Sequence, residues 1–257
     1  MKLGIGLPNT LEDVDRDLIL SWAQKAEDGP FDSLGVFDRL LYHSLEPFQT
    51  LSLCAGATED LRLVTAIVAA PLRPTAILAK TAATLDVLSG GRLTLGLGLG
   101  AREEDYEAAE ADYHSRGDRF TQQLKDLRDY WDNESLDPQP LQAGGPEILV
   151  GGRSDRAFGR VARFADGFIQ SGGPPSVFER EANKACSAWQ EADRPGEPSL
   201  WGHGYFALGE EEAREGEKHL LDYYAFTGPF AETVAEGLLD TPPENCAVCS
   251  RIPGQRL

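Results

Sequence analysis

The segment best suited to bind an anion consists of Gly151, Gly152, Arg153 and Ser154. It follows the short apolar run 148–150 and precedes apolar residues that are spaced as in a helix. Backbone N–H groups at a helix start, the helix dipole, a serine hydroxyl and a guanidinium all favour a phosphate. A glycine turn followed by a serine cap produces the same pattern without any ligand. The residues alone leave both interpretations open.

Asp38 and Arg39 are the next candidates for chemistry, because they directly follow the apolar run 31–37. If this run is a strand of a barrel, both residues lie at the carboxyl end of the strand, where the active sites of such folds lie. We therefore select them as candidate catalytic residues. Neighbouring Asp and Arg residues also form surface ion pairs without a catalytic role, and this alternative stays open.

A glycine-rich stretch places Gly96, Gly98 and Ala101 in the pattern G-x-G-x-x-A, a loose form of the dinucleotide-binding fingerprint. The acidic residues 103–105 that follow would repel a pyrophosphate at the helix start. The stretch also ends the fourth strand-like run, whereas the fingerprint usually opens its fold. The sequence favours glycines that let a strand approach a ligand or a neighbouring strand. An NAD(P)-binding domain is the alternative.

The sequence contains no other motif typical of catalysis, since G-x-S-x-G, a Walker loop and H-E-x-x-H are all absent. Its four histidines are not paired at ligand spacing, so no metal site is predicted. Cys246 and Cys249 form a C-x-x-C pair outside any strand–helix redox context, and we expect no redox role for them.

Short apolar runs alternate with amphipathic helical patterns along most of the chain. A clear helical stripe consists of Phe120, Leu124, Leu127 and Trp131. The alternation predicts an α/β fold in which helices cover a parallel sheet. Seven strand–helix units in about 240 residues approach the ~250 residues of a (β/α)8 TIM barrel, with a doubly wound sheet as the alternative. The strand-like runs are residues 2–7, 31–37, 61–69, 92–99, 148–150, 167–170 and 201–208.

No linker, internal repeat or low-complexity segment divides the chain, so we expect a single domain over residues 1–257. Residues 240–257 depart from the pattern because they contain no helical stripe. If the fold is a barrel, its eighth unit is expected to be shortened or lost.

The composition excludes several classes of protein. A net charge of −18 argues against a nucleic-acid partner, which would require a basic surface. No apolar run approaches the ~20 residues that cross a bilayer, and the first residues lack the long apolar stretch of a signal peptide. Four cysteines are too few for a disulfide framework. We therefore expect a cytoplasmic protein without a membrane partner.

Residues 61–131 carry the most specific pattern in the chain, including LRLVTAIVAAPLRPTAILAK at its start and SGGRLTLGLGLGAREEDYE in its middle. Three further pieces occur in a matching order: KLGIGLPN at 2–9, FDSLGVFDRL at 31–40 and PEILVGGRSDRAFGRVARFADGFI at 146–169. Together they resemble the luciferase-like monooxygenases, the flavin- or F420-dependent oxidoreductases related to bacterial luciferase. The resemblance implies an eightfold (β/α) barrel, in agreement with the alternation of elements.

The resemblance also implies roles for particular residues. Ala66 and Ile67 match a backbone bulge, often a non-prolyl cis peptide, that supports the isoalloxazine ring. The segment 151–154 matches the junction that holds the cofactor phosphate, and Asp38 matches an acidic position near the ring. Asp38 or Arg39 would orient the ring or the substrate. The rim of the pocket would include Leu7, Asn9, Gly98 and Ser171.

Two departures from the family pattern limit what the resemblance implies. F420-dependent sugar-phosphate dehydrogenases have His and Glu where this chain has Arg39 and Ala101, so that reaction is not expected. After Thr241-Pro242 the sequence PENCAVCSRIPGQRL replaces the final helix, strand and helix of the family. We expect an oxidoreductase that uses reduced FMN or F420 on a small organic substrate, as a homodimer. The alternative is a flavoprotein that binds cofactor without turnover.

Overall fold

A parallel sheet of eight strands forms the centre of the computed structural model, which describes residues 2–133, 136–170 and 172–238. The strands follow the order β1-β2-β3-β5-β6-β7-β8, and β4 pairs with β5 beside this path. Every strand pair is parallel. The strands are β1 (Gly4–Gly6), β2 (Ser33–Val36), β3 (Arg62–Thr65), β4 (Val68–Ala69), β5 (Leu93–Gly98), β6 (Glu147–Gly151), β7 (Gly167–Ile169) and β8 (Ser199–Trp201).

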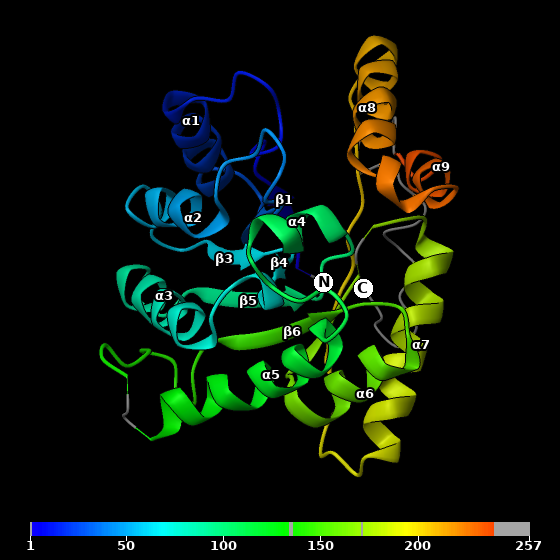
Figure 1. The fold of residues 1–257 in the computed structure, drawn as a ribbon. Coiled ribbons are helices and arrows are strands. Elements are labelled where there is room, and N and C mark those ends of the chain that lie inside the picture. The colour runs from blue at the N-terminus through cyan, green and yellow to red at the C-terminus, as the bar shows by residue number, and fades with distance from the viewer. Residues whose placement is uncertain (1, 134–135, 171, 239–257) are drawn as a thin grey trace.

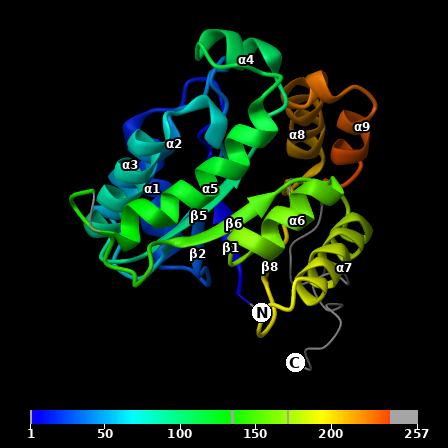
Figure 2. The same cartoon turned by 60° about the horizontal axis from the view of Figure 1, so that its bottom comes forward.

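Helices alternate with the strands and surround the sheet. They are α1 (Arg16–Glu27), α2 (Pro47–Ala55), α3 (Thr75–Leu88), α4 (Glu103–Ala108), α5 (Arg116–Asp132), α6 (Asp155–Phe164), α7 (Pro175–Glu191), α8 (Glu210–Tyr223) and α9 (Phe230–Ala235), with short 3-10 turns η1 (Ala70–Leu72) and η2 (Ala225–Thr227). Figure 1 shows α1, α2 and α3 along one side of the strands, α5 and α6 below them, and α7 opposite. In Figure 2, α4, α8 and α9 lie at one end of the molecule.

Local sequence signals explain where several helices begin. Asp15 caps α1 by accepting a hydrogen bond from the N–H of Leu18 at 2.8 Å. Pro47 occupies the first turn of α2, where its missing N–H costs nothing. Ser154 caps α6 by accepting from the N–H of Ala157 at 3.2 Å. The serine cap, one of the two interpretations of this segment that the sequence left open, is therefore present.

The core lies between the sheet and its helices. Every residue of β5 is buried, as expected for a strand that is covered on both faces. The predicted helical stripe on α5 is confirmed, because all four of its residues are buried: Phe120, Leu124, Leu127 and Trp131. These side chains belong to the same cluster as the inward residues of the strands and of α2, α3 and α6.

The strand order distinguishes between the two folds that the sequence left open. A doubly wound sheet reverses its strand order at a switch point. Here, apart from the short β4, each strand lies beside the strands that precede and follow it in the chain, as in a barrel. Within residues 2–133, 136–170 and 172–238, no strand joins β8 to β1, so the described sheet is a curled, partly open barrel. The predicted tail 240–257 lies outside the described residues.

The seventh predicted strand, residues 201–208, is wrong in its extent. The strand β8 spans Ser199–Trp201, and among residues 202–208 only Phe206 forms a single β-bridge. Two glycines, Gly202 and Gly204, interrupt the apolar pattern here and weaken strand formation. His203 and Tyr205 between them stack on Phe37 instead of pairing along the sheet.

A second, smaller apolar cluster lies outside the main core. It joins α8, η2 and α9 and contains Leu220, Tyr223, Tyr224, Ala231, Val234 and Ala235. In Figure 1 these helices stand beside the barrel rather than around it. None of the helices in the described ranges combines the length and the apolarity that a bilayer crossing requires.

Candidate active site

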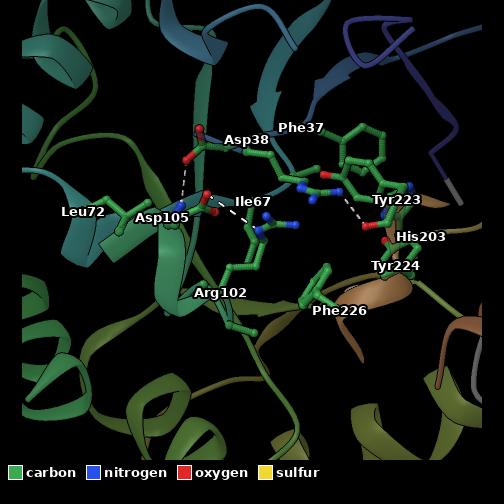
Figure 3. A pocket seen from close by; sticks show the side chains of 15 residues that line it. Phe37, Asp38, Ile67, Leu72, Arg102, Asp105, His203, Tyr223, Tyr224 and Phe226 are labelled. Atoms are coloured by element: carbon green, nitrogen blue, oxygen red, sulfur yellow. Dashed lines mark hydrogen bonds and ion pairs between the residues drawn. The ribbon is translucent and has the colours of Figure 1, made fainter. Parts of the chain in front are cut away.

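A cavity of about 130 Å³ lies where the chain leaves the carboxyl ends of β2, β3 and β5. Three of its walls come from the first half of the chain and one from the segment between β8 and η2 (Figure 3). Its lining contains the two predicted catalytic residues and the predicted bulge. The lining residues are Phe37, Asp38, Arg39, Ala66, Ile67, Ala69, Leu72, Gly100, Ala101, Arg102, Asp105, His203, Tyr223, Tyr224 and Phe226.

The bulge between β3 and β4 forms part of the cavity wall. The peptide bond between Ala66 and Ile67 is cis, although Ile67 is not proline. The predicted non-prolyl cis peptide is thus confirmed in position. The N–H of Ala66 donates to the carbonyl of Val36 at 2.8 Å, which ties the bulge to β2.

Three glycines make room for this bulge. A Cβ on Gly98 would lie 2.0 Å from Cδ1 of Ile67, and a Cβ on Gly151 would lie 3.1 Å from the same atom. A Cβ on Gly96 would lie 2.0 Å from the carbonyl oxygen of Thr65. The glycine pattern 96–98 is therefore explained by close approach of neighbouring backbone and side chain, the interpretation that the sequence favoured. Gly98 supports the wall from behind and does not itself line the cavity.

Asp38 lies in the cavity wall, but its carboxylate is fully engaged. Only 5% of the side chain is exposed, and it accepts hydrogen bonds from the N–H of Ala69 at 2.9 Å and from Nη1 of Arg73 at 2.7 Å. Nη2 of Arg73 also donates to Asp38 at 3.1 Å and to Glu46 at 3.1 Å. The negative charge of Asp38 is matched, so this residue holds β4 in place. Arg73 was not selected from the sequence because its partner lies 35 residues away.

Arg39 connects the loop after β2 to the C-terminal helices. Its Nη1 donates to the carbonyl of Tyr223 at 2.6 Å, and its guanidinium lies 4.1 Å from the ring centre of Tyr42 and 4.7 Å from that of Tyr223. Burial, followed by the nearby charge of Arg102, lowers the pKa of Arg39 from its ordinary value. The guanidinium therefore has a fixed orientation at the cavity.

His203 is a cavity residue that sequence reasoning missed. Its ring stacks on Phe37 with ring centres 5.0 Å apart, and burial lowers the pKa of the imidazole to about 4. It is therefore neutral at physiological pH. It follows the observed end of β8 at Trp201 but lies inside the strand predicted at 201–208, so no sequence signal selected it.

The predicted phosphate segment lies at the end of β6, and Ser154 is the N-cap of α6. Gly152 has a φ of 140°, and a Cβ there would lie 2.8 Å from Cβ of Ala157, so the tight turn requires glycine. The first N–H groups of a helix have no acceptor within the helix. Residues 151–154 therefore stay a candidate for holding a phosphate through backbone N–H groups.

Arg153 is less free than the sequence suggested. Its Nε lies 3.1 Å from Oε1 of Glu181, and its guanidinium lies 3.5 Å from the ring centre of Phe230. Its Nη2 donates to the carbonyl of Gly172 at 3.2 Å. The side chain of Glu181 is 4% exposed, and burial raises the pKa of its carboxyl. The sequence contained no signal for this pairing, which joins α6 to the middle of α7.

The phosphate segment and the cavity are neighbours separated by aromatic side chains. Tyr224 lines the cavity and shares a hydrogen bond of 2.5 Å with the hydroxyl of Tyr205. A Cβ on Gly172 would lie 3.2 Å from Tyr205 and 3.5 Å from the hydroxyl of Tyr224. Because the carbonyl of Gly172 accepts from Arg153, these tyrosines lie between the two parts of the site.

The remaining predicted residues have structural roles or fall outside the description. Asn9 is buried, donates to the carbonyl of Phe37 at 2.9 Å and accepts from its N–H at 3.1 Å, so it fixes the end of β2. Leu7 is buried in the core. Ser171 lies outside the described residues, as do Cys246 and Cys249.

Comparison with known proteins gives a consistent picture. The family model described as luciferase-like monooxygenase matches residues 1–241. An uncharacterised protein of Mycobacterium tuberculosis is 33% identical over 164 residues, which cover 58% of this chain and 56% of that protein. The oxygenase component of a flavin-dependent trigonelline monooxygenase from Acinetobacter baylyi is 28% identical over 217 residues, covering 74% of this chain and 58% of the relative. The chain thus spans less than two thirds of these relatives.

Solved structures share the fold at low sequence identity. Monooxygenase RslO1 from Streptomyces bottropensis superimposes with a TM-score of 0.74 and 22% identity, covering 92% of this chain and 80% of that one. An F420-dependent secondary alcohol dehydrogenase in complex with an F420-acetone adduct gives a TM-score of 0.72 and 19% identity, with coverage of 91% and 78%. At this level of identity the similarity shows the fold alone.

Proposed function

The chain belongs to the luciferase-like monooxygenase family, and we propose that it is an oxidoreductase that uses reduced FMN or F420 on a small organic substrate. The observation that carries this proposal is the cavity at the strand ends, whose wall contains the bulge at Ala66 and Ile67 together with Asp38 and Arg39. The start of α6 at residues 151–154, our candidate for the phosphate, is separated from this cavity by Tyr205 and Tyr224. A flat ring with a phosphate tail needs both features.

The residues present fit such a cofactor. Ala66 and Ile67 would support the ring, and glycines at 98 and 151 leave the space that Ile67 requires. The backbone of residues 151–154 and the hydroxyl of Ser154 would hold the phosphate. The bound cofactor supplies hydride transfer or, in the case of reduced FMN, activation of oxygen.

The remaining residues would position the substrate and exclude water. Asp38 fixes β4 through Ala69 and Arg73, so it acts as a positioning residue. Arg39 presents its guanidinium to the cavity and would orient the substrate. Aromatic side chains from the C-terminal segment, Tyr223 and Tyr224, cover the cavity and reduce the access of water.

Both cofactors stay in the proposal because the relatives support each of them. An FMNH2-dependent dimethylsulfone monooxygenase from Pseudomonas fluorescens is 31% identical over 134 residues, and the trigonelline enzyme is described as flavin-dependent. The alcohol dehydrogenase that shares the fold is described as F420-dependent.

Titration of the purified chain with FMN, F420 and NADPH in parallel tests this proposal. A ligand at a hundredfold excess over its dissociation constant stabilises the folded state by about 2.7 kcal/mol. This corresponds to a rise in Tm of about 5 to 10 °C for a chain of this size. A shift with FMN or F420 is expected. No shift with either would contradict the proposal, and a shift with NADPH alone would favour a dinucleotide site.

A matched pair of variants tests the phosphate segment. Arg153→Gln is expected to weaken FMN about fivefold and riboflavin, which has no phosphate, hardly at all. The reason is that a positive charge beside the phosphate segment is lost while its backbone donors stay in place. Arg180→Gln is the control, since Arg180 lies beside the same Glu181 but is 62% exposed. An equal loss of both ligands in Arg153→Gln would contradict a phosphate contact.

A second candidate function is cofactor binding without turnover. The open edge between β8 and β1 in the described part of the chain favours it, because a strand between these two would help to line the site. Cofactor binding without oxidation of reduced FMN or F420 in the presence of substrate candidates would support this function.

We further infer a single-domain homodimer in the cytoplasm. The resemblance to the family supports the dimer, and the free thiols of Cys54 and Cys186 agree with a reducing compartment. Light scattering after size-exclusion chromatography measures the oligomeric state, and a monomer at micromolar concentration would contradict the dimer.

A further inference from the structure

Two guanidinium groups line the same small cavity. Arg39 comes from the loop after β2, and Arg102 is the N-cap residue of α4. Figure 3 shows Arg102 reaching from the wall toward Ile67 and Asp105. The two arginines are close enough for the charge of one to lower the pKa of the other, Arg39.

The positive charge of this pair is only partly matched. Among the described residues, Arg39 has no ion-pair partner, and its Nη1 is bound to a backbone carbonyl. Arg102 has one acidic neighbour, with its Nε 3.7 Å from Oδ1 of Asp105. That oxygen already accepts from the N–H of Leu41 at 3.1 Å. The other carboxylate of the cavity, Asp38, is paired with Arg73.

Each arginine also has a donor that lacks a partner. The Nε atoms of Arg39 and Arg102 are both buried, and in the described part of the chain neither has a hydrogen-bond acceptor. A buried donor without an acceptor costs free energy, so the protein itself matches the two guanidinium groups incompletely. Guanidinium groups bind carboxylates especially well because their geometry allows two parallel hydrogen bonds.

The rest of the lining suits an apolar, flat molecule. Phe37, Tyr223 and Phe226 contribute aromatic rings, and His203 is neutral. The guanidinium of Arg39 is held against aromatic rings, so its plane is fixed before a ligand arrives.

We propose that Arg39 and Arg102 bind the carboxylate of the substrate, and that the substrate is a small organic acid with a flat apolar body. This inference rests on the proposed function, because it places the substrate in the same cavity as the bulge at Ala66 and Ile67. It adds a substrate class and a specificity-determining residue, Arg102, which lay outside the candidates selected from the sequence.

Benzoate and benzamide are suitable probes because they have nearly the same shape and differ in charge. Their affinities are measured by calorimetry on the full chain, with and without saturating FMN or F420. Benzoate is expected to bind at least tenfold more tightly than benzamide. Arg39→Gln and Arg102→Gln are each expected to weaken benzoate at least tenfold and to leave benzamide within twofold. Arg16→Gln is the control, because Arg16 is 72% exposed on α1 and should affect neither ligand.

Three results would overturn the proposal. Equal affinity of the wild-type chain for benzoate and benzamide would show that charge is not recognised. An equal loss of both ligands in the variants would indicate a change of cavity shape, and circular dichroism melts identify a variant that fails to fold. A tenfold loss of FMN or F420 in the variants, with benzoate unchanged, would assign the arginines to the cofactor.

Failure of this inference is distinguishable from failure of the proposed function. If neither FMN nor F420 binds the wild-type chain, the proposed function is wrong, whereas the benzoate preference is still measured on the chain alone. If a cofactor binds and benzoate has no advantage, the function stands and the substrate class is wrong.

Discussion

The replacement Asp38→Asn is expected to weaken both the fold and the cavity. In the wild type one carboxylate accepts from the N–H of Ala69 and from two nitrogens of Arg73. An amide of the same shape retains one oxygen, and its NH2 group would face a donor of Arg73. One partner of a nearly buried ion pair is thus lost while the other keeps its charge.

The magnitude follows from the burial of the pair. Asp38 is 5% exposed and Arg73 20%, so the pair belongs with buried ion pairs. Removal of one partner from such a pair costs about 3 to 5 kcal/mol. Glu46 still accepts from Arg73 at 3.1 Å, which places the expected loss near the lower end, at about 3 kcal/mol. The corresponding fall in Tm is about 6 to 12 °C.

Urea denaturation followed by circular dichroism measures this loss. The matched control is Glu46→Gln, because Glu46 contacts the same arginine and its side chain is 44% exposed. This variant should lower the free energy of unfolding by less than about 1 kcal/mol. FMN or F420 affinity should also fall in Asp38→Asn, because β4 and the bulge at residues 66–67 lose their anchor. Equal and small losses in the two variants would refute the argument that Asp38 holds β4.

Three further outcomes are expected. Gly98→Ala should lower the free energy of unfolding by about 1 to 3 kcal/mol and weaken cofactor binding, because its Cβ would overlap Ile67. Gly6→Ala has open space around its Cβ and should lower the free energy of unfolding by only about a few tenths of a kcal/mol. Urea melts and cofactor titrations of both variants check this. Because burial lowers the pKa of His203 from 6.5 to about 4, protonation favours the unfolded chain below pH 6.5. Between pH 6.5 and 4, the free energy of unfolding of the wild type should therefore fall by up to about 3 kcal/mol relative to that of His203→Phe. If the unfolding free energies of the two proteins change with pH in parallel, the lowered pKa of His203 is contradicted. Glu181→Gln should increase the affinity for FMN about fivefold relative to that for riboflavin, because it removes a negative charge worth about 1 kcal/mol beside the phosphate segment. An unchanged ratio of the two dissociation constants in a fluorescence titration would contradict this.

The fold was largely predictable because its signals are local. Alternation of apolar runs and helical stripes indicated the parallel sheet, and burial of the four-residue stripe on α5 confirmed the helix face. The choice between barrel and doubly wound sheet was not local, because it depends on which strands pair. The strand at 201–208 was predicted too long because its apolar residues suggested a strand although Gly202 and Gly204 interrupt it. Of this stretch only His203 lines the cavity, and Phe206 and Leu208 are exposed.

The geometry of the candidate site was predictable where one segment carries the whole signal. The bulge at Ala66 and Ile67 and the helix start at 151–154 are continuous stretches, and both lie where the resemblance placed them. Residues whose roles depend on distant partners were missed. Arg73 and Glu181 matter because of the charges they match, and Tyr224 because the chain returns to the cavity after β8. Nothing in the neighbouring sequence of these residues distinguishes them from surface residues.

The cavity joins the beginning of the chain to its end, and this has a consequence for biosynthesis. Arg39 bonds to a residue 184 positions later, Tyr42 bonds to Asp222 across 180 positions, and Thr10 meets His219 across 209. Contacts of such long sequence separation form late, because the entropy of closing the loop must be overcome first. On the ribosome the early strands and helices emerge long before Tyr223 does. The walls of the cavity from residues 37–105 therefore leave the ribosome before the segment that completes it, residues 203–226.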